Sequence, residues 1–260
     1  MNKLLFIAFL VSSVGSNAFA AIKEKTVEYK HGEAVLEGFL AYDTKGSKKK
    51  PAVLIVHNWN SIDEYERMRT REIAKLGYVA FAVDIYGKGI RPKTTEESAT
   101  LSGSYKNNIP MFRGRLLAAF EEVSKMANVD PKNIAVMGYC FGGTGALELG
   151  RAGAEVKGVV SFHGGLKTPD PKDAKNIKGK VLVLHGADDP HVPDNEVLAF
   201  QKEMRDAAVD WQLVSYGGAV HAFTEKEAGN DNSKGAAYNK AADKRSWEVT
   251  KDFFKEIFKK

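Results

Sequence analysis

Short, almost continuous apolar runs alternate with amphipathic segments along most of the chain, and this alternation constrains the fold more than any other feature. We predict strands over residues 27–29, 35–42, 52–57, 79–84, 134–138, 156–162, 181–185 and 212–216. The later runs are rich in Val, Leu, Ile and Ala, as strands covered on both faces are, whereas the first two alternate like an antiparallel edge. The pattern therefore predicts an α/β fold with a mostly parallel central sheet of about eight strands and helices on both faces.

Helices are expected where apolar residues recur with helical spacing. The first begins at Ser61, which forms a capping-box pattern with Glu64, and it ends before Gly77. The others are expected over residues 112–126, 141–150, 196–208 and 246–258. The segment from Gly87 to Pro110 is rich in Gly, Thr, Ser and Asn, so we expect a loop or lid over the sheet. Residues 163–180 must cross over the sheet, but two prolines weaken any helix there.

The N-terminal segment has the anatomy of a secretory signal peptide. Lys3 precedes an apolar run from Leu4 to Val14, and Ala18-Phe19-Ala20 is a small-x-small cleavage motif. The run is too short for a spanning helix, although an uncleaved anchor is the alternative. We therefore expect residues 1–20 to be removed, residues 21–260 to form a single domain, and the mature protein to be periplasmic or secreted.

Composition excludes several classes of protein. Hydrophobic residues make up 43% of the 260 residues and charged residues 27%, which excludes a disordered chain, a collagen-like repeat and a disulfide-stapled miniprotein. The net charge of +5 is spread out, and its one dense cluster, residues 45–50, contains no aromatic residue. That cluster is typical of a solvated loop. We expect a monomer without a nucleic-acid partner, and without a membrane partner once the leader is cleaved.

The single cysteine, Cys140, lies in the sequence Gly138-Tyr-Cys-Phe-Gly142, between a buried strand and a helix. Gly-x-Cys-x-Gly in that setting is a nucleophile elbow with sulfur in place of the usual serine oxygen. The glycines lack side chains that would clash with the neighbouring strand and helix. The helix N-terminus favours a thiolate, and the N–H of Phe141 can face an oxyanion. The alternative is a tight turn around a buried, inert cysteine.

A nucleophilic thiolate needs a base, and the base needs an orienting group. Asp189 lies on the loop that leaves the seventh predicted strand, and His221 lies on a Gly-rich loop after the last one. The chain order of nucleophile, acid and histidine is that of the α/β-hydrolase fold, which gathers such residues at the carboxyl ends of its strands. Asp188 is the rival acid.

Further residues are candidates for the oxyanion region and the substrate pocket. The backbone N–H of Asn58 or of Trp59 is a candidate second oxyanion donor, and His57 is expected to line the same region. The side chains of Trp59, Phe141 and Phe223 are candidate pocket walls, with ordinary loop packing as the alternative. The histidines show neither H-x-H nor H-x-x-x-H spacing, so we expect no metal and no cofactor.

Three segments together resemble the dienelactone hydrolase family from about residue 26 to the C-terminus: residues 138–143, residues 76–89, and Asp189-x-x-Val-Pro. The resemblance implies an α/β-hydrolase fold and a Cys–His–Asp triad, which falls on Cys140, His221 and Asp189. It also implies hydrolysis of a small-molecule lactone or ester through a thioester intermediate, without metal.

Two positions depart from the family pattern. Asn58 stands where members often carry a carboxylate that contacts the resting thiol. Glu225 stands four residues after His221, near where members that cleave the dienelactone carry an arginine for the substrate carboxylate. We therefore expect neutral lactones or short esters as substrates, unless Lys88 and Arg91 fold over the site.

Two other functions are compatible with the same residues. One is a broader carboxylesterase or thioesterase. The other is a non-catalytic protein that keeps the fold to bind a ligand or to sense oxidation through Cys140.

Overall fold

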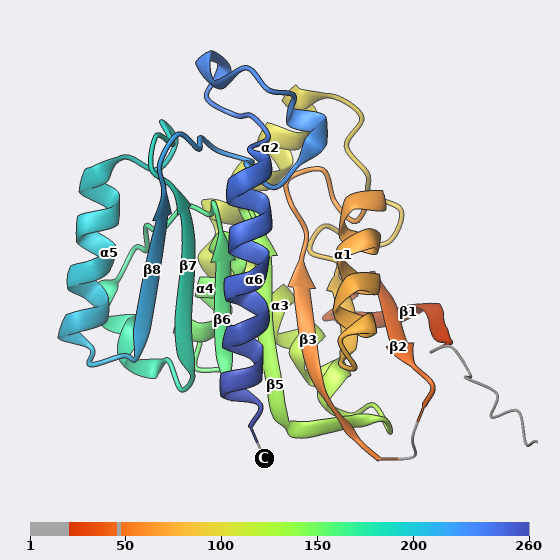
Figure 1. Cartoon of the computed structure of the whole chain (residues 1–260). Helices are drawn as coiled ribbons and strands as arrows, with labels where there is room; N and C mark the ends of the chain where they lie inside the picture. Colours follow the sequence, from red (N-terminus) through yellow and green to blue (C-terminus); the bar gives the residue numbers. More distant parts are fainter. Residues whose placement is uncertain (1–20, 46–47, 260) are drawn as a thin grey trace, which may run out of the picture.

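A computed structural model describes residues 21–45 and 48–259. Its eight strands form one sheet in the order β1-β2-β4-β3-β5-β6-β7-β8 (Figure 1). β1 and β2 are antiparallel to each other, β2 is antiparallel to β4, and every other pair of neighbours is parallel. The strand bounds are Ile22–His31, Ala34–Asp43, Lys50–Val56, Val79–Val83, Val129–Tyr139, Gly158–Phe162, Lys180–Gly186 and Trp211–Tyr216. The predicted mostly parallel α/β sheet is thus confirmed.

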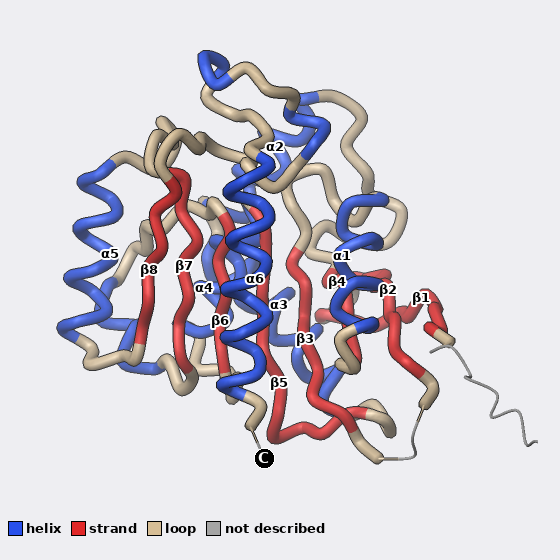
Figure 2. The backbone as a smooth tube through the Cα atoms, viewed as in Figure 1, coloured by secondary structure: helices blue, strands red, loops and turns tan. Residues whose placement is uncertain are grey.

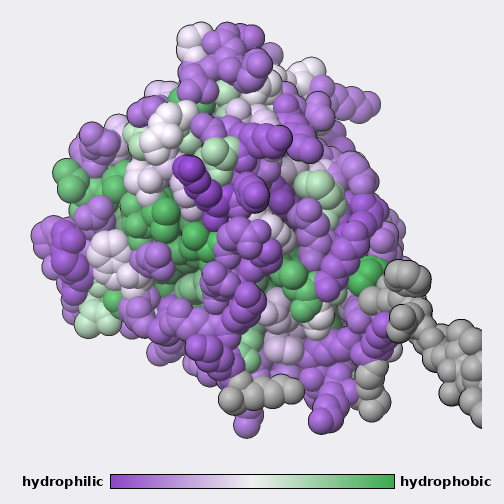
Figure 3. All heavy atoms as spheres, in the orientation of Figure 1, coloured by the Kyte–Doolittle hydropathy of each residue, from purple (hydrophilic) through white to green (hydrophobic). Residues whose placement is uncertain are grey.

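Helices cover both faces of the sheet (Figures 1 and 2). On one face, α1 (Glu64–Lys75) and α6 (Lys240–Ile257) contribute to one hydrophobic cluster. On the other face, α3 (Ile109–Ser124), α4 (Phe141–Arg151) and α5 (Asp194–Asp206) contribute to a second. The outer surface of α1 and α6 is largely hydrophilic (Figure 3), as expected of helices that bury one apolar side.

The prediction of a loop over residues 87–110 is wrong in part, because this segment contains the helix α2 (Thr95–Lys106). Thr94 caps this helix by accepting the N–H of Glu97. Two of the three residues that α2 buries are serines, so the segment lacks the apolar periodicity by which helices are recognised. α2 lies beyond the upper ends of the strands in Figure 1.

The start of α1 also differs from the prediction. The capping box is formed by Asp63 and Glu66 rather than by Ser61 and Glu64. The crossover from β6 to β7 contains only a short 3₁₀ helix, Pro171–Asn176. The expected signal peptide lies outside the described residues. Across residues 21–45 and 48–259, no helix is both long and apolar enough to cross a membrane.

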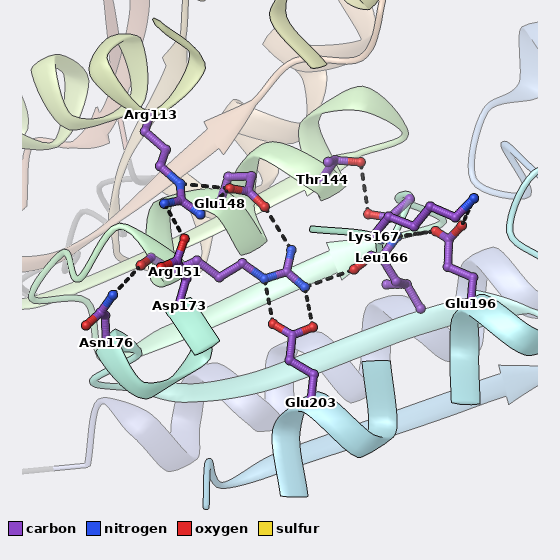
Figure 4. Close-up of polar contacts among 11 residues, drawn as sticks. Arg113, Thr144, Glu148, Arg151, Leu166, Lys167, Asp173, Asn176, Glu196 and Glu203 are labelled. Carbon is purple, nitrogen blue, oxygen red and sulfur yellow. Dashed lines mark hydrogen bonds and ion pairs between the residues drawn. The ribbon is translucent and has the colours of Figure 1, made fainter. Parts of the chain in front are cut away.

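A buried ion network fixes the C-terminal end of α4 (Figure 4). The fully buried Arg151 guanidinium donates to both carboxylate oxygens of Glu203, at 2.8 and 2.7 Å. It also donates to Glu148 and to the carbonyl of Leu166, both at 2.9 Å. Arg113 binds the second oxygen of Glu148 at 2.8 Å. The network joins α3, α4 and α5 to the loop after β6, and α4 is the helix that directly follows Cys140.

We predict that Arg151→Met lowers the free energy of unfolding by about 3–5 kcal/mol, because Glu148 and Glu203 would stay buried without their main cation. Denaturant unfolding followed by tryptophan fluorescence measures this loss. Lys202→Met is the control, since Lys202 makes only an exposed pair with Asp206 on the surface of α5 and should change little. Equal losses in the two variants would contradict the assigned role of the network.

Candidate active site

The backbone around Cys140 is strained and closely packed. Cys140 is the N-cap of α4 and has φ 53° and ψ −116°, a conformation that residues other than glycine rarely adopt. A Cβ atom on Gly138 would lie 2.0 Å from the carbonyl oxygen of Gly142, and one on Gly142 would lie 2.0 Å from the carbonyl oxygen of Val56. Any side chain at either glycine would therefore push α4 away from the strand ends. The predicted elbow requires glycine at both positions for this reason.

Three predicted side chains meet at this elbow. Cys140 Sγ lies 3.0 Å from His221 Nε2, and His221 Nδ1 lies 2.8 Å from Asp189 Oδ2. The other carboxylate oxygen of Asp189 accepts the backbone N–H of His191 at 2.8 Å, which fixes its orientation. Asp188 is exposed and lies outside this chain of hydrogen bonds. The geometry thus favours Asp189 over Asp188 as the partner of the histidine.

Charge interactions shift the pKa values of His221 and Asp189 in opposite directions. Burial lowers the pKa of His221, but the Cys140 sulfur and the Asp189 carboxylate outweigh burial and raise this pKa to about 10. Burial raises the pKa of Asp189, but its hydrogen bond to His221 and the charge of that ring outweigh this and lower it. A doubly protonated ring donates from Nε2 to sulfur and from Nδ1 to Asp189. The site therefore favours an imidazolium held between the Cys140 sulfur and the Asp189 carboxylate.

Backbone N–H groups at the start of α4 and on the loop after β3 are candidate oxyanion donors. The N–H of Phe141 lies in the first turn of α4, where no intrahelical acceptor exists. The N–H of Asn58 is already taken, because it donates to the buried Glu66 carboxylate at 3.0 Å. This corrects the expectation for Asn58 and leaves Trp59, whose N–H contacts no acceptor within the described part of the chain. Phe141 and Trp59 are the two candidate donors.

Three of the expected pocket residues instead belong to the core. His57 is fully buried, where its Nε2 accepts the N–H of Ile85 at 3.2 Å and its Nδ1 contacts the carbonyl oxygen of Asn58. Burial lowers its pKa to about 4, so the ring is neutral. Phe141 stacks on Phe112 with ring centroids 4.6 Å apart. Phe223 is also fully buried. Among the aromatic candidates only Trp59 is partly exposed.

Asn58 and Glu225 contact each other beside the triad. Asn58 Nδ2 donates to Glu225 Oε2 at 3.2 Å, while Glu225 Oε1 is buried and has no hydrogen-bond partner within the described residues. Burial raises the pKa of Glu225 to about 7, although the charge of His221 opposes this rise. A carboxyl group that titrates near neutral pH therefore lies beside the position that departs from the family pattern.

The two cations expected as possible covers for the site bind elsewhere. Lys88 Nζ lies 2.6 Å from Glu28 on β1, and Arg91 lies 3.7 Å from Glu37 on β2. Both side chains tie the loop after β4 to the N-terminal hairpin. They are engaged there, away from Glu225.

Sequence reasoning missed Glu66, His163 and Thr224. Glu66 is the N3 residue of the capping box on α1, and one of its oxygens reaches the loop after β3. His163 accepts the backbone N–H of Cys140 at 3.2 Å and contacts Thr224 at 2.8 Å. The only sequence signal for His163 was its position directly after β6. This signal can be used only once the strand order shows that β6 lies next to β5.

The remaining histidines near the site do not gather as metal ligands. His185 is buried, and burial lowers its pKa. His191 packs edge-on against His221, with ring centroids 5.2 Å apart. Within residues 21–45 and 48–259, no three His, Cys, Asp or Glu side chains converge as a metal site would require.

Comparison with known proteins identifies relatives over most of the chain. The family described as "Dienelactone hydrolase family" matches residues 36–258. A solved structure named "m3DLH" is 35% identical, with a TM-score of 0.88 over 92% of this chain and 99% of that one. A dienelactone hydrolase-like promiscuous phosphotriesterase, P91 from metagenomic libraries, is 35% identical with a TM-score of 0.86, covering 91% and 99% of the two chains.

A protein of Saccharolobus solfataricus named "Putative carboxymethylenebutenolidase" is 25% identical, covering 91% of this chain and 100% of its own. The family match spans far more than half of the sequence, and the two solved structures superpose on this fold over nearly their whole length. With its elbow cysteine at the start of α4, this chain belongs to the dienelactone hydrolase family.

Proposed function

We propose that this protein hydrolyses neutral lactones or short esters with Cys140 as nucleophile, His221 as proton carrier and Asp189 as the group that orients the imidazole. Family membership supports hydrolase activity on esters and lactones. The observation that carries the proposal is the continuous chain from Sγ to Nε2 at 3.0 Å and from Nδ1 to the Asp189 carboxylate at 2.8 Å. This chain starts at a strained helix N-terminus, which is where an activated thiolate is expected.

In the first half of the reaction, the Cys140 thiolate attacks the carbonyl carbon and the carbonyl π electrons move to oxygen. The N–H groups of Phe141 and Trp59 stabilise the resulting oxyanion. When the tetrahedral intermediate collapses, the C–O bond to the leaving group breaks and His221 Nε2 protonates the departing alkoxide. The acyl group is then held on sulfur as a thioester.

In the second half, neutral His221 takes a proton from water, and the hydroxide attacks the thioester carbonyl. Collapse expels the thiolate, restores the imidazolium–thiolate pair and releases the acid. One water is consumed for each ester bond cleaved. The proposal includes export, which rests on the signal-peptide pattern of residues 1–20.

A second candidate activity is cleavage of phosphotriesters. It is favoured by the 35% identity with a relative that is named a promiscuous phosphotriesterase. The same thiolate would attack phosphorus and expel an alkoxide that His221 protonates. Water activated by neutral His221 would then break the P–S bond, release the phosphodiester and restore the thiolate. A neutral phosphotriester assayed beside a carboxylic ester tests this activity on the same preparation.

We predict that Cys140→Ala abolishes turnover of an activated ester, with a loss of more than about a thousandfold, while unfolding is unchanged. Intact mass of the wild-type protein during turnover should show one added acyl group, and the variant should show none. Cys140→Ser should also be poor, because an imidazole tuned to a thiolate does not ionise an alcohol well. A variant that kept more than about a tenth of the rate would exclude Cys140 as nucleophile. Acylation without repeated turnover would instead indicate the non-catalytic alternative.

We predict that Asp189→Asn lowers kcat by about a hundredfold or more, because an amide cannot stabilise the imidazolium. Asp188→Asn is the matched control on the neighbouring residue and should leave kcat within about twofold, since an exposed carboxylate that does not contact His221 contributes little. Steady-state kinetics on one ester measures both. A larger loss at Asp188 would reverse the assignment.

Discrimination against anionic substrates should depend on pH through Glu225. This carboxyl group ionises as pH rises through about 7, so repulsion of a substrate carboxylate should strengthen above that pH. The measurement compares kcat/KM for an ester that carries a carboxylate with its methyl ester, at about one pH unit on either side of this pKa. In the wild type, we expect the preference for the methyl ester over the carboxylate-bearing ester to grow several-fold as pH rises. In Glu225→Gln, this preference should not change with pH. The same pH trend in both proteins would contradict the role of Glu225.

A further inference from the structure

His163 is a buried side chain beside the triad that the proposed mechanism does not use. It follows β6 directly, and only 1% of its surface is exposed. Its φ of 37° lies in the left-handed region, which costs about 1–3 kcal/mol for a residue with a side chain. The hydrogen bonds of this ring indicate why a strained, buried imidazole lies next to the reactive sulfur.

The first contact of His163 is with the backbone of the nucleophile. The N–H of Cys140 is shared between the carbonyl of Phe162, at 3.0 Å, and Nδ1 of His163, at 3.2 Å. Because an N–H can only donate, Nδ1 must be the unprotonated nitrogen of the ring. The single ring proton is therefore on Nε2.

The second contact leads to the loop that carries His221. Nε2 of His163 donates to the hydroxyl of Thr224 at 2.8 Å, and Thr224 is three residues after His221. The same hydroxyl lies 2.7 Å from the phenol oxygen of Tyr65 on α1, which also accepts from Arg69 at 3.3 Å. The ring thus joins the elbow to the histidine loop and, beyond it, to a helix on the opposite side of the sheet from α4.

The backbone around His163 is packed too closely to shift. A Cβ atom on Gly164 would lie 2.6 Å from the backbone of Gly143 in α4, so the residue after His163 is pressed against the first turn of that helix. The His163 ring also packs edge-on against His221, with centroids 5.3 Å apart. His163 is therefore fixed relative to both the nucleophile and the base.

We propose that His163 is a positioning residue, whose neutral imidazole bridges the Cys140 backbone and Thr224 and so sets the distance between the Cys140 sulfur and His221. Protonation of Nδ1 would place two donors against each other and break the bridge. The titratable and charged groups around the ring are Cys140, His221, Tyr65, Tyr139 and Arg69. Burial first, and then the positive charge of His221, keep the pKa of His163 well below its ordinary value, so the bridging form persists.

The test measures the thiolate as well as turnover, because the proposal rests on the proposed function. Cys140 is the only cysteine in the sequence, so the rate of alkylation by iodoacetamide against pH reports its ionisation directly. Thr224→Val removes the hydroxyl at nearly constant volume, and Thr224→Ser is the matched variant that keeps it. His163→Leu removes both contacts, whereas His163→Asn keeps an acceptor near Cys140 and tolerates a positive φ.

We expect Thr224→Val and His163→Leu to slow alkylation at mildly acidic pH and to lower kcat, each by about tenfold, with KM within about twofold. Thr224→Ser should match the wild type, and His163→Asn should lie in between. If His163→Leu does not fold, the comparison of Thr224→Val with Thr224→Ser tests the proposal. Alkylation profiles and kcat values that coincide for Thr224→Val and Thr224→Ser would overturn the proposal. Fast alkylation of the wild type without ester turnover would refute the proposed function, while the alkylation profiles would still test His163.

Discussion

The close contact between the end of β3 and the first turn of α4 is the constraint on which the site depends. A hydrogen atom is all that fits between the Cα of Gly142 and the carbonyl oxygen of Val56. Because the helix starts so close to the sheet, Cys140 must adopt a positive φ, and its sulfur lies at the helix N-terminus. The helix dipole and the free N–H of Phe141 are then directed at the same small volume. A single backbone contact thus positions the proposed nucleophile, the helix dipole that would activate it and one candidate oxyanion donor.

Two imidazoles lie against each other at this point and are held in opposite protonation states. The rings of His221 and His163 are 5.3 Å apart, and burial lowers the pKa of both. His221 has a sulfur and the Asp189 carboxylate as acceptors, so its pKa rises despite burial. His163 has no carboxylate partner, and burial together with the positive charge of His221 keeps its pKa well below the ordinary value. Burial acts on both rings in the same direction, so the difference between their pKa values comes from the charged groups beside each ring.

The sequence predicted what is encoded locally. Alternating apolar residues located the first two strands and nearly continuous apolar runs located the other six, and the elbow was recognisable because its spacing reflects a single turn of backbone. The second use of Glu66 was not predictable. Its Oε2 caps α1 through the N–H of Asp63, while its Oε1 takes the N–H of Asn58 from another loop. A capping-box pattern shows only the first of these contacts. α2 was missed for a related reason, since it buries small polar residues that leave no apolar periodicity.

Three of the five non-glycine residues with a positive φ in the described part of the chain lie at the site. They are Cys140, His163, and Ala222 next to His221, with φ values of 53°, 37° and 55°, and the other two are Ser61 and Ala208. Each costs about 1–3 kcal/mol, so the rest of the structure must hold them in place. His163 accepts a hydrogen bond from the Cys140 N–H and donates one to Thr224, and these two bonds join the strained segments to each other. The Arg151 network holds the far end of α4 and the loop after β6. These contacts hold the strained residues at the strand ends in place. The same contacts therefore maintain the distance between the Cys140 sulfur and the His221 imidazole.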